Sequence, residues 1–143
     1  MTPSYISKSK PARKWLHAEF TAAILDAARD VHLALHNRAY SEENYREALA
    51  RELRRRGHVV QTQVRYPRLF KAEVVGESIV DLVLADKVVV LIKTSSKISE
   101  EYFNLLKTYC ADAHLSVGLV LAFNRLDFIF KRFDAPPTQK SGG

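Results

Sequence analysis

Two short apolar runs decide the fold of this chain: Ile-Val-Asp-Leu-Val-Leu at residues 79–84 and Val-Val-Val-Leu-Ile-Lys at residues 88–93. Runs of five or six aliphatic, mostly β-branched residues joined by a short polar connection are typical of two adjacent buried strands. Asp81 lies inside the first run, and Lys93 closes the second. The sequence therefore predicts a strand pair in the centre of a sheet that carries one acid and one base.

The register of this pair follows from its connection. If residues 85–87 form the turn, Leu84 pairs with Val88 and Asp81 falls opposite Leu91. Lys93 then lies on the same face as Leu91, diagonally from Asp81 and within reach of its carboxylate. Because burying an isolated charge is costly, the acid and the lysine either form a structural ion pair or face a cleft.

Periodicity predicts the elements around this pair. Apolar spacings of three and four indicate helices over residues 15–35, 42–56 and 99–112, the second capped by Ser41 and ended by Gly57. Alternation indicates a strand at 60–66 that Pro67 ends, and further strands are expected at 70–75, with a turn at Gly76, and at 117–123 and 128–133. This order of elements predicts an α/β domain with a central mixed sheet flanked by helices.

Length and composition favour one domain. Of the 143 residues, 1–14 are expected to form a flexible basic arm, 15–133 a single domain and 134–143 a disordered tail. Neither a secretory leader nor a membrane-length apolar run is apparent, so we expect a cytoplasmic protein without a membrane partner. The single cysteine, Cys110, lies in a predicted helix and is expected to be a buried core residue.

The chain carries a net charge of +6, which favours polyanions such as DNA or RNA. Basic residues gather at the end of the second predicted helix and in the strand that follows. The candidate nucleic-acid contacts are Arg51, Arg54, Arg55, Arg56, Arg65 and Arg68. The alternative interpretation is a solvated helix end, where positive charge also complements the helix dipole.

Four segments resemble, in order and at matching spacing, the GxxExxY protein family, a group within the PD-(D/E)XK nuclease superfamily. They are residues 28–32, which end in Val-His at His32; 39–45, which carry Glu42 and Tyr45 of the naming motif; 80–93; and the pair 105–109 and 118–123. The resemblance covers about residues 20–133. It implies a restriction-endonuclease-like (PD-(D/E)XK) core.

The resemblance also implies roles for three residues. Asp81 would be a ligand of Mg²⁺, Lys93 would position or deprotonate the attacking water, and Glu42 would be an accessory acid from the helix. A divalent ion lowers the pKa of its bound water and neutralises charge that develops on a scissile phosphate. Mg²⁺ prefers oxygen ligands, commonly carboxylates, water and phosphate.

This chain departs from the family at the polar positions of the site. The second strand acid of the motif is Leu91, and the other departures are Ala39, Ile79, Asn104 and Ala122. Leucine cannot bind a metal ion. The sequence therefore predicts a degraded metal site without a cofactor, in a non-catalytic module that binds nucleic acid or serves assembly.

Two alternatives remain open at this stage. One is a Mg²⁺-dependent nuclease whose missing carboxylate comes from elsewhere, with Glu42 or Glu77 as the source. The other is a purely structural protein with a protein partner or a second copy of itself. A zinc site at His32 and His36, four residues apart on a helix, is disfavoured because no further ligand cluster accompanies them.

Overall fold

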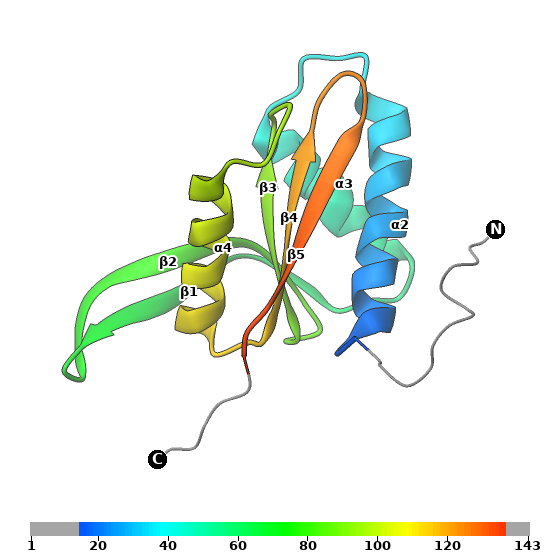
Figure 1. Cartoon of the computed structure of the whole chain (residues 1–143). Helices are drawn as coiled ribbons and strands as arrows, with labels where there is room; N and C mark the ends of the chain where they lie inside the picture. Colours follow the sequence, from blue (N-terminus) through cyan, green and yellow to red (C-terminus); the bar gives the residue numbers. More distant parts are fainter. Residues whose placement is uncertain (1–14, 137–143) are drawn as a thin grey trace.

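The computed structural model describes residues 15–136 as one mixed sheet with helices on both faces (Figure 1). The elements are α2 (Ala18–Leu35), α3 (Glu42–Arg55), β1 (Val60–Phe70), β2 (Glu73–Leu84), β3 (Val88–Lys93), α4 (Glu100–Ala113), β4 (Val117–Phe123) and β5 (Phe128–Asp134). The strand order is β1-β2-β3-β4-β5, and only the β3–β4 pair is parallel. The predicted α/β class and mixed sheet are confirmed.

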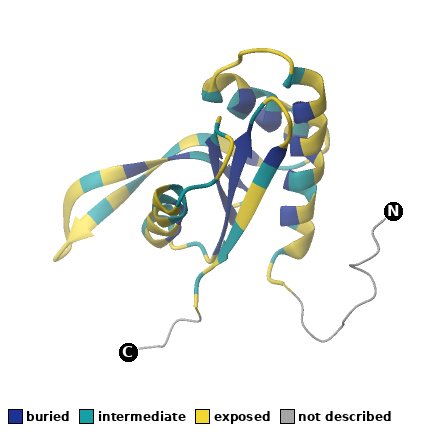
Figure 2. Ribbon diagram, turned by 45° about the horizontal axis from the view of Figure 1, so that its top comes forward, coloured by how far each residue is buried: buried dark blue, intermediate teal, exposed yellow. Residues whose placement is uncertain are grey.

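Two clusters of buried side chains hold the layers together (Figure 2). Helices α2 and α3 pack on one face of the sheet through residues such as Ile24 and Leu49. Helix α4 covers the other face through Leu106 and Cys110. β3 and β4 are almost wholly buried between these layers, whereas β2 is buried only toward its end, where Asp81 is half-buried among buried neighbours.

The helix boundaries follow the capping residues predicted from the sequence. Ser41 and Asn44 form a reciprocal capping box at the start of α3, with contacts of 3.0 and 3.2 Å. Gly57 follows this helix with a φ of 95°, the left-handed conformation that favours glycine. Ser99 caps α4 by accepting the Tyr102 N–H.

The β1–β2 hairpin corrects two predictions. Pro67 does not end the first strand, because β1 is an edge strand where a missing N–H costs no ladder bond. Gly76 lies inside β2 rather than in a turn. The reversal comes earlier, at Lys71 and Ala72, which both have positive φ. Two long strands therefore replace the expected three short ones and project from the body of the domain (Figure 1).

The pleat of the sheet changes beside Asp81. Val80 packs in the α4 cluster and Leu82 in the α2–α3 cluster, although they are two residues apart and a regular strand would place them on one face. Opposite Asp81 on β1 lies Gln63, which has a φ of 50° and is missing from the strand register. This local twist takes Asp81 out of regular pairing.

The domain extends slightly beyond its predicted end. Asp134, expected to begin the tail, instead closes β5, where Arg132 contacts its carboxylate at 2.7 Å. The predicted basic arm at 1–14 lies outside the described residues, as does the tail from residue 137. Within residues 15–136, no helix is both long enough and apolar enough to span a bilayer.

Candidate functional site

Asp81 lies where β2 and β3 separate. Backbone pairing between the strands ends at Leu82 and Val90, so the paired register stops one residue before Asp81 and Leu91, which were predicted to lie opposite each other. Its carboxylate accepts the Ile92 N–H at 2.8 Å, so one oxygen replaces the lost ladder bond. Burial raises the pKa of the Asp81 carboxyl above its usual range, and the Ile92 N–H opposes that rise only in part.

Leu91, at the position of the second acid, is a core residue. It is 3% exposed and packs with Val80, Leu106 and Val120 under helix α4. An apolar side chain in this place excludes water from the neighbourhood of Asp81 and offers no ligand atom. The burial of Leu91 therefore contributes to the stability of the α4 layer, at about 1.5–3 kcal/mol for a fully buried leucine.

Within residues 15–136, Lys93 forms no ion pair with Asp81, so the structural ion pair that the sequence left open as one alternative is not realised. Its ammonium instead lies 4.8 Å from the centroid of the Tyr102 ring on α4. None of the ion pairs within residues 15–136 joins Lys93 to a carboxylate. The contact with an aromatic face holds the lysine away from the strand acid.

Helix α3 brings a carboxylate and a guanidinium to the same end of the sheet. Glu42 accepts the Thr94 N–H at 3.2 Å, and its charge raises the pKa of Asp81. Arg46, one turn further along, lowers the pKa of Asp81, and its effect exceeds that of Lys93. Its side chain is 11% exposed, and its Nε is buried without a hydrogen-bond partner.

Sequence reasoning missed Arg46. Its i+4 spacing from Glu42 places both side chains on one face of α3, and this spacing could have identified it. Glu43 and Glu47 lie 3.9 and 3.8 Å from its guanidinium, beyond hydrogen-bond range. Of these two cations, Arg46 of α3 therefore lowers the pKa of Asp81 more than Lys93 does.

The residues at this strand end do not fit a Mg²⁺ ion. A hard cation needs several oxygen ligands, whereas Asp81 already uses one oxygen for the Ile92 N–H and Leu91 replaces the second acid. Glu77, one proposed source of a replacement acid, pairs with Arg65 on the hairpin instead. Across residues 15–136, no group of three or more histidine, cysteine or acidic side chains has the arrangement of a metal site.

The other four positions at which the sequence departs from the family that it resembles differ in how deeply they are buried. Ala122 is fully buried in β4, directly beside Lys93 in the parallel register. Ile79 is 38% exposed, so the predicted strand at 79–84 is not buried throughout. Asn104 lies on the exposed side of α4, and Ala39 is an exposed residue between α2 and α3. The polar groups that a metal site would need are therefore missing on both sides of Lys93.

His32 and Tyr45, the two motif residues, have structural roles. His32 Nε2 contacts the Asn124 carbonyl at 2.8 Å, and His36 Nδ1 contacts the Arg125 carbonyl at 3.2 Å. The two histidine rings stack at 5.1 Å and tie α2 to the β4–β5 loop. Tyr45 is buried and stacks on Phe123 with ring centroids 4.5 Å apart.

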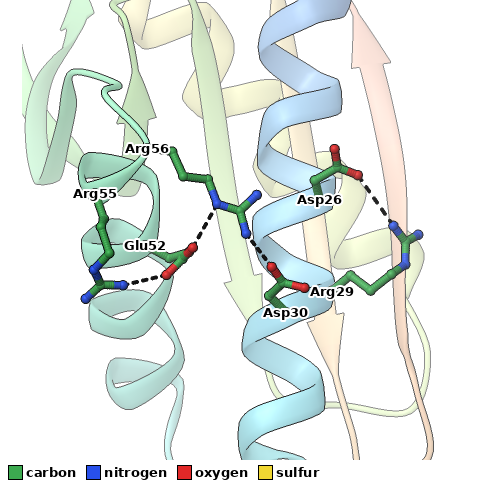
Figure 3. Close-up of polar contacts among 6 residues, drawn as sticks. All are labelled: Asp26, Arg29, Asp30, Glu52, Arg55 and Arg56. Carbon is green, nitrogen blue, oxygen red and sulfur yellow. Dashed lines mark hydrogen bonds and ion pairs between the residues drawn. The ribbon is translucent and has the colours of Figure 1, made fainter.

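The arginines at the end of α3 each have a partner within the chain. Glu52 accepts from Arg55 at 2.5 Å and from Arg56 at 2.8 Å, and Arg56 reaches across to Asp30 of α2 (Figure 3). The other four candidates are engaged as well: Arg51 with Glu47, Arg54 with the Val60 carbonyl, Arg65 with Glu77 and Arg68 with Asp112. These contacts reduce the net positive charge that the six arginines offer to a phosphate, although an exposed guanidinium keeps further N–H donors.

Cys110 is a core residue, as predicted. It is 1% exposed, and burial raises the pKa of its thiol to about 12. It packs closely against Gly118 of β4, where an added Cβ would lie 2.7 Å from the Cys110 Sγ. A thiol that is both buried and protonated is not a nucleophile.

A family model matches this chain, and two solved structures are similar to it. The family model of the PD-(D/E)XK nuclease superfamily matches residues 18–133. The crystal structure of an alkaline exonuclease (LHK-Exo) from Laribacter hongkongensis is similar with 16% identity and a TM-score of 0.47, covering 84% of this chain and 83% of that chain. The crystal structure of SSO0001 is similar with 16% identity and a TM-score of 0.45, covering 81% of this chain and 67% of that chain.

No curated protein matches the sequence. The family model spans all the helices and strands from α2 almost to the end of β5, and the sheet order and flanking helices are those of a restriction-endonuclease-like core. The chain belongs to the PD-(D/E)XK nuclease superfamily.

Proposed function

We propose that this protein is a non-catalytic nucleic-acid-binding module built on a nuclease fold whose metal site is degraded. The observation that carries the proposal is the burial of Leu91 at the position of the second strand acid. Asp81 and Lys93 have taken up contacts with the Ile92 N–H and the Tyr102 ring. The strand end therefore lacks the oxygen ligands that hydrolysis would use, and the proposed function needs no divalent ion.

Three lysines that form no ion pair within residues 15–136 support nucleic-acid binding. Lys107 of α4 and Lys131 of β5 lie over the Phe103 ring, at 5.2 and 4.1 Å from its centroid. Lys93 lies over the adjacent Tyr102. Positive charge beside aromatic faces, not neutralised by acids, suits a phosphate backbone with unstacked bases. We name Lys93, Tyr102, Phe103, Lys107 and Lys131 the α4 surface.

A binding titration tests this proposal. Fluorescence anisotropy in EDTA, with single- and double-stranded DNA and RNA, measures affinity as a function of salt concentration. We expect binding at low salt that weakens as salt rises, since the binding of phosphates releases counterions. The Lys107→Ala/Lys131→Ala variant should lower the log–log salt slope by about one for each phosphate that it no longer binds. Arg51→Ala/Arg55→Ala, which removes the same charge from paired arginines, is the matched control and should change the slope less.

The absence of binding to every probe at low salt would contradict the proposal. It would favour the structural alternative, in which the positive charge has no polyanion partner. A Mg²⁺-dependent nuclease is the second candidate, because Glu42 accepts the Thr94 N–H directly after β3, the strand whose Ile92 N–H binds Asp81. Metal-dependent cleavage that Asp81→Ala abolishes would identify that activity.

A further inference from the structure

Three loops enclose a pocket of about 230 Å³ at the end of the domain where β3 and β4 finish. One loop joins α2 to α3, the second follows β3, and the third joins β4 to β5; all three lie at the top of Figure 1. The buried, stacked rings of Tyr45 and Phe123 contribute to its lining. Thr94, which donates its N–H to Glu42, connects the pocket to the strand end that carries Asp81.

Hydrogen bonds from the Asn124 side chain join two of the three loops, the one after β3 and its own β4–β5 loop. The Asn124 side chain donates to the Ser95 carbonyl at 3.2 Å. Its oxygen accepts the N–H groups of Leu126 and Asp127 at 3.0 and 3.1 Å. His32 and His36 fix the backbone of Asn124 and Arg125 from the α2 side. A pocket held in this way binds a ligand at a smaller entropic cost than a mobile loop would.

The residues that line the pocket favour an anionic ligand. Arg38 and Arg125 contribute two guanidinium groups, and neither forms an ion pair within residues 15–136. Thr94, Ser95 and Ser96 also line the pocket, and the hydroxyl of Ser95 already donates to the Lys97 carbonyl at 2.8 Å, which leaves those of Thr94 and Ser96 as candidate donors. No carboxylate residue lines the pocket. Guanidinium and hydroxyl donors in this combination are those that proteins use to bind phosphate.

We propose that this pocket binds the phosphate of a nucleotide, with Arg38 and Arg125 as its ligands and the hydroxyls of Thr94 and Ser96 as further donors. The inference rests on the proposed nucleic-acid binding and identifies one site at which a strand is held. Tyr40, which lines the pocket and whose hydroxyl accepts from Arg38 at 3.5 Å, presents a 37% exposed ring to a base or sugar attached to that phosphate.

The test compares two double variants of equal charge. Arg38→Ala/Arg125→Ala removes both pocket cations, and Arg29→Ala/Arg51→Ala removes two exposed arginines outside the pocket. Anisotropy measures the affinity of each protein for a short single-stranded oligonucleotide with and without a 5′-phosphate. We expect the pocket variant to lose at least about tenfold in affinity relative to the control, since it removes two sources of charge-assisted hydrogen bonds to the phosphate.

Comparing the loss of affinity on the two oligonucleotides identifies the kind of phosphate that the pocket binds. A loss confined to the phosphorylated oligonucleotide assigns the pocket to a terminal phosphate, and an equal loss on both oligonucleotides assigns it to an internal phosphodiester. Equal affinities of the two double variants for both oligonucleotides would overturn the inference, because net charge alone would then account for binding.

A second readout separates failure of the pocket from failure of the proposed function. Inorganic phosphate is titrated into the ¹⁵N-labelled protein, and we expect saturable shifts of the amide signals of residues 94–96 that the Arg38→Ala/Arg125→Ala variant lacks. Such shifts without any oligonucleotide binding would refute nucleic-acid binding but retain the phosphate pocket. Shifts that do not saturate, or that persist unchanged in the variant, would refute the pocket itself.

Discussion

The strand end around Asp81 and the loop pocket around Arg38 both carry polar side chains but differ in what those side chains contact. At the strand end, the Asp81 carboxylate binds a backbone N–H and Lys93 lies on an aromatic ring. In the pocket, Arg38 and Arg125 form no ion pair within the described part of the chain, while Asn124 and two histidines hold the walls. A polar group already satisfied by its own chain binds ligands poorly, so motif residues alone do not locate function in this fold.

The largest effect is expected from Leu91→Glu. This change removes a buried leucine and places a carboxylate in an apolar layer, so we expect a loss of about 3–5 kcal/mol in the free energy of unfolding without metal. Because it also supplies the second acid of the motif, Mn²⁺ should raise the melting temperature of the variant but not that of the native protein. Thermal unfolding with and without Mn²⁺ measures both effects.

Leu91→Met is the control for packing, since it keeps the volume and should cost less than about 1.5 kcal/mol. An equal rise in melting temperature for native and variant proteins on addition of Mn²⁺ would mean that the native strand end already binds the ion. The strand end around Asp81 would then bind a ligand although its polar groups are engaged, and the stated difference from the loop pocket would be wrong.

His32→Ala is expected to have the next largest effect. It removes a buried ring that contacts the Asn124 carbonyl and stacks against His36, so we expect a loss of about 2 kcal/mol. Amide exchange should also become faster in the β4–β5 loop, because the variant no longer anchors this loop to α2 through residue 32. Unchanged exchange in residues 124–127 would show that the pocket wall does not depend on this histidine.

A double-mutant cycle between Lys93→Met and Tyr102→Leu measures a smaller effect. The ammonium lies 4.8 Å from the ring centroid, and an interaction of this kind contributes about 0.5–1 kcal/mol at an exposed site. The coupling of Lys93→Met with Asp81→Asn should be weaker than the coupling with Tyr102→Leu. Urea unfolding measures both couplings. A stronger coupling of Lys93 with Asp81 than with Tyr102 would support an ion pair between Lys93 and Asp81.

The smallest effect is the pH dependence of Asp81→Asn. Because burial raises the pKa of Asp81 in the folded state, the acid stabilises the fold at low pH, and that contribution is lost as pH rises through the folded-state pKa. Asparagine can still accept the Ile92 N–H and does not titrate. The variant should therefore gain stability relative to the native protein between about pH 4 and pH 7.

Urea unfolding at both pH values checks this change, and Asp26→Asn, an exposed carboxyl on α2, controls for the removal of one negative charge. A native protein that gains stability over the variant as pH rises would show that the Asp81 carboxylate is stabilised in its charged form.

The sequence was sufficient to predict most of the fold. The helix caps at Ser41 and Ser99 and the pairing of Leu84 with Val88 depend on local chemistry, and all three are confirmed. The hairpin was mispredicted because Pro67 and Gly76 usually interrupt strands. At the sheet edge, Pro67 gives up no ladder bond, and reversal at Lys71–Ala72 leaves Gly76 within β2.

Predictions of the site were less complete, because charge pairing across the fold is not visible in the sequence. The predicted register holds only as far as Leu82 and Val90, one residue short of Asp81. Lys93 lies over the ring of Tyr102, on a helix that follows β3. The approach of Arg46 to Asp81 depends on how α3 crosses the sheet. The pocket at Arg38 and Arg125 joins loops that are far apart in the sequence, so no local pattern could predict it.

The most direct test of the degraded site is a nuclease assay with Mg²⁺ or Mn²⁺ on single- and double-stranded DNA and RNA, comparing the native protein with Asp81→Ala. Since Leu91 removes a ligand and Asp81 is already engaged, we expect no cleavage by the native protein above that of the variant. Metal-dependent cleavage by the native protein that Asp81→Ala abolishes would contradict this account and establish an active nuclease.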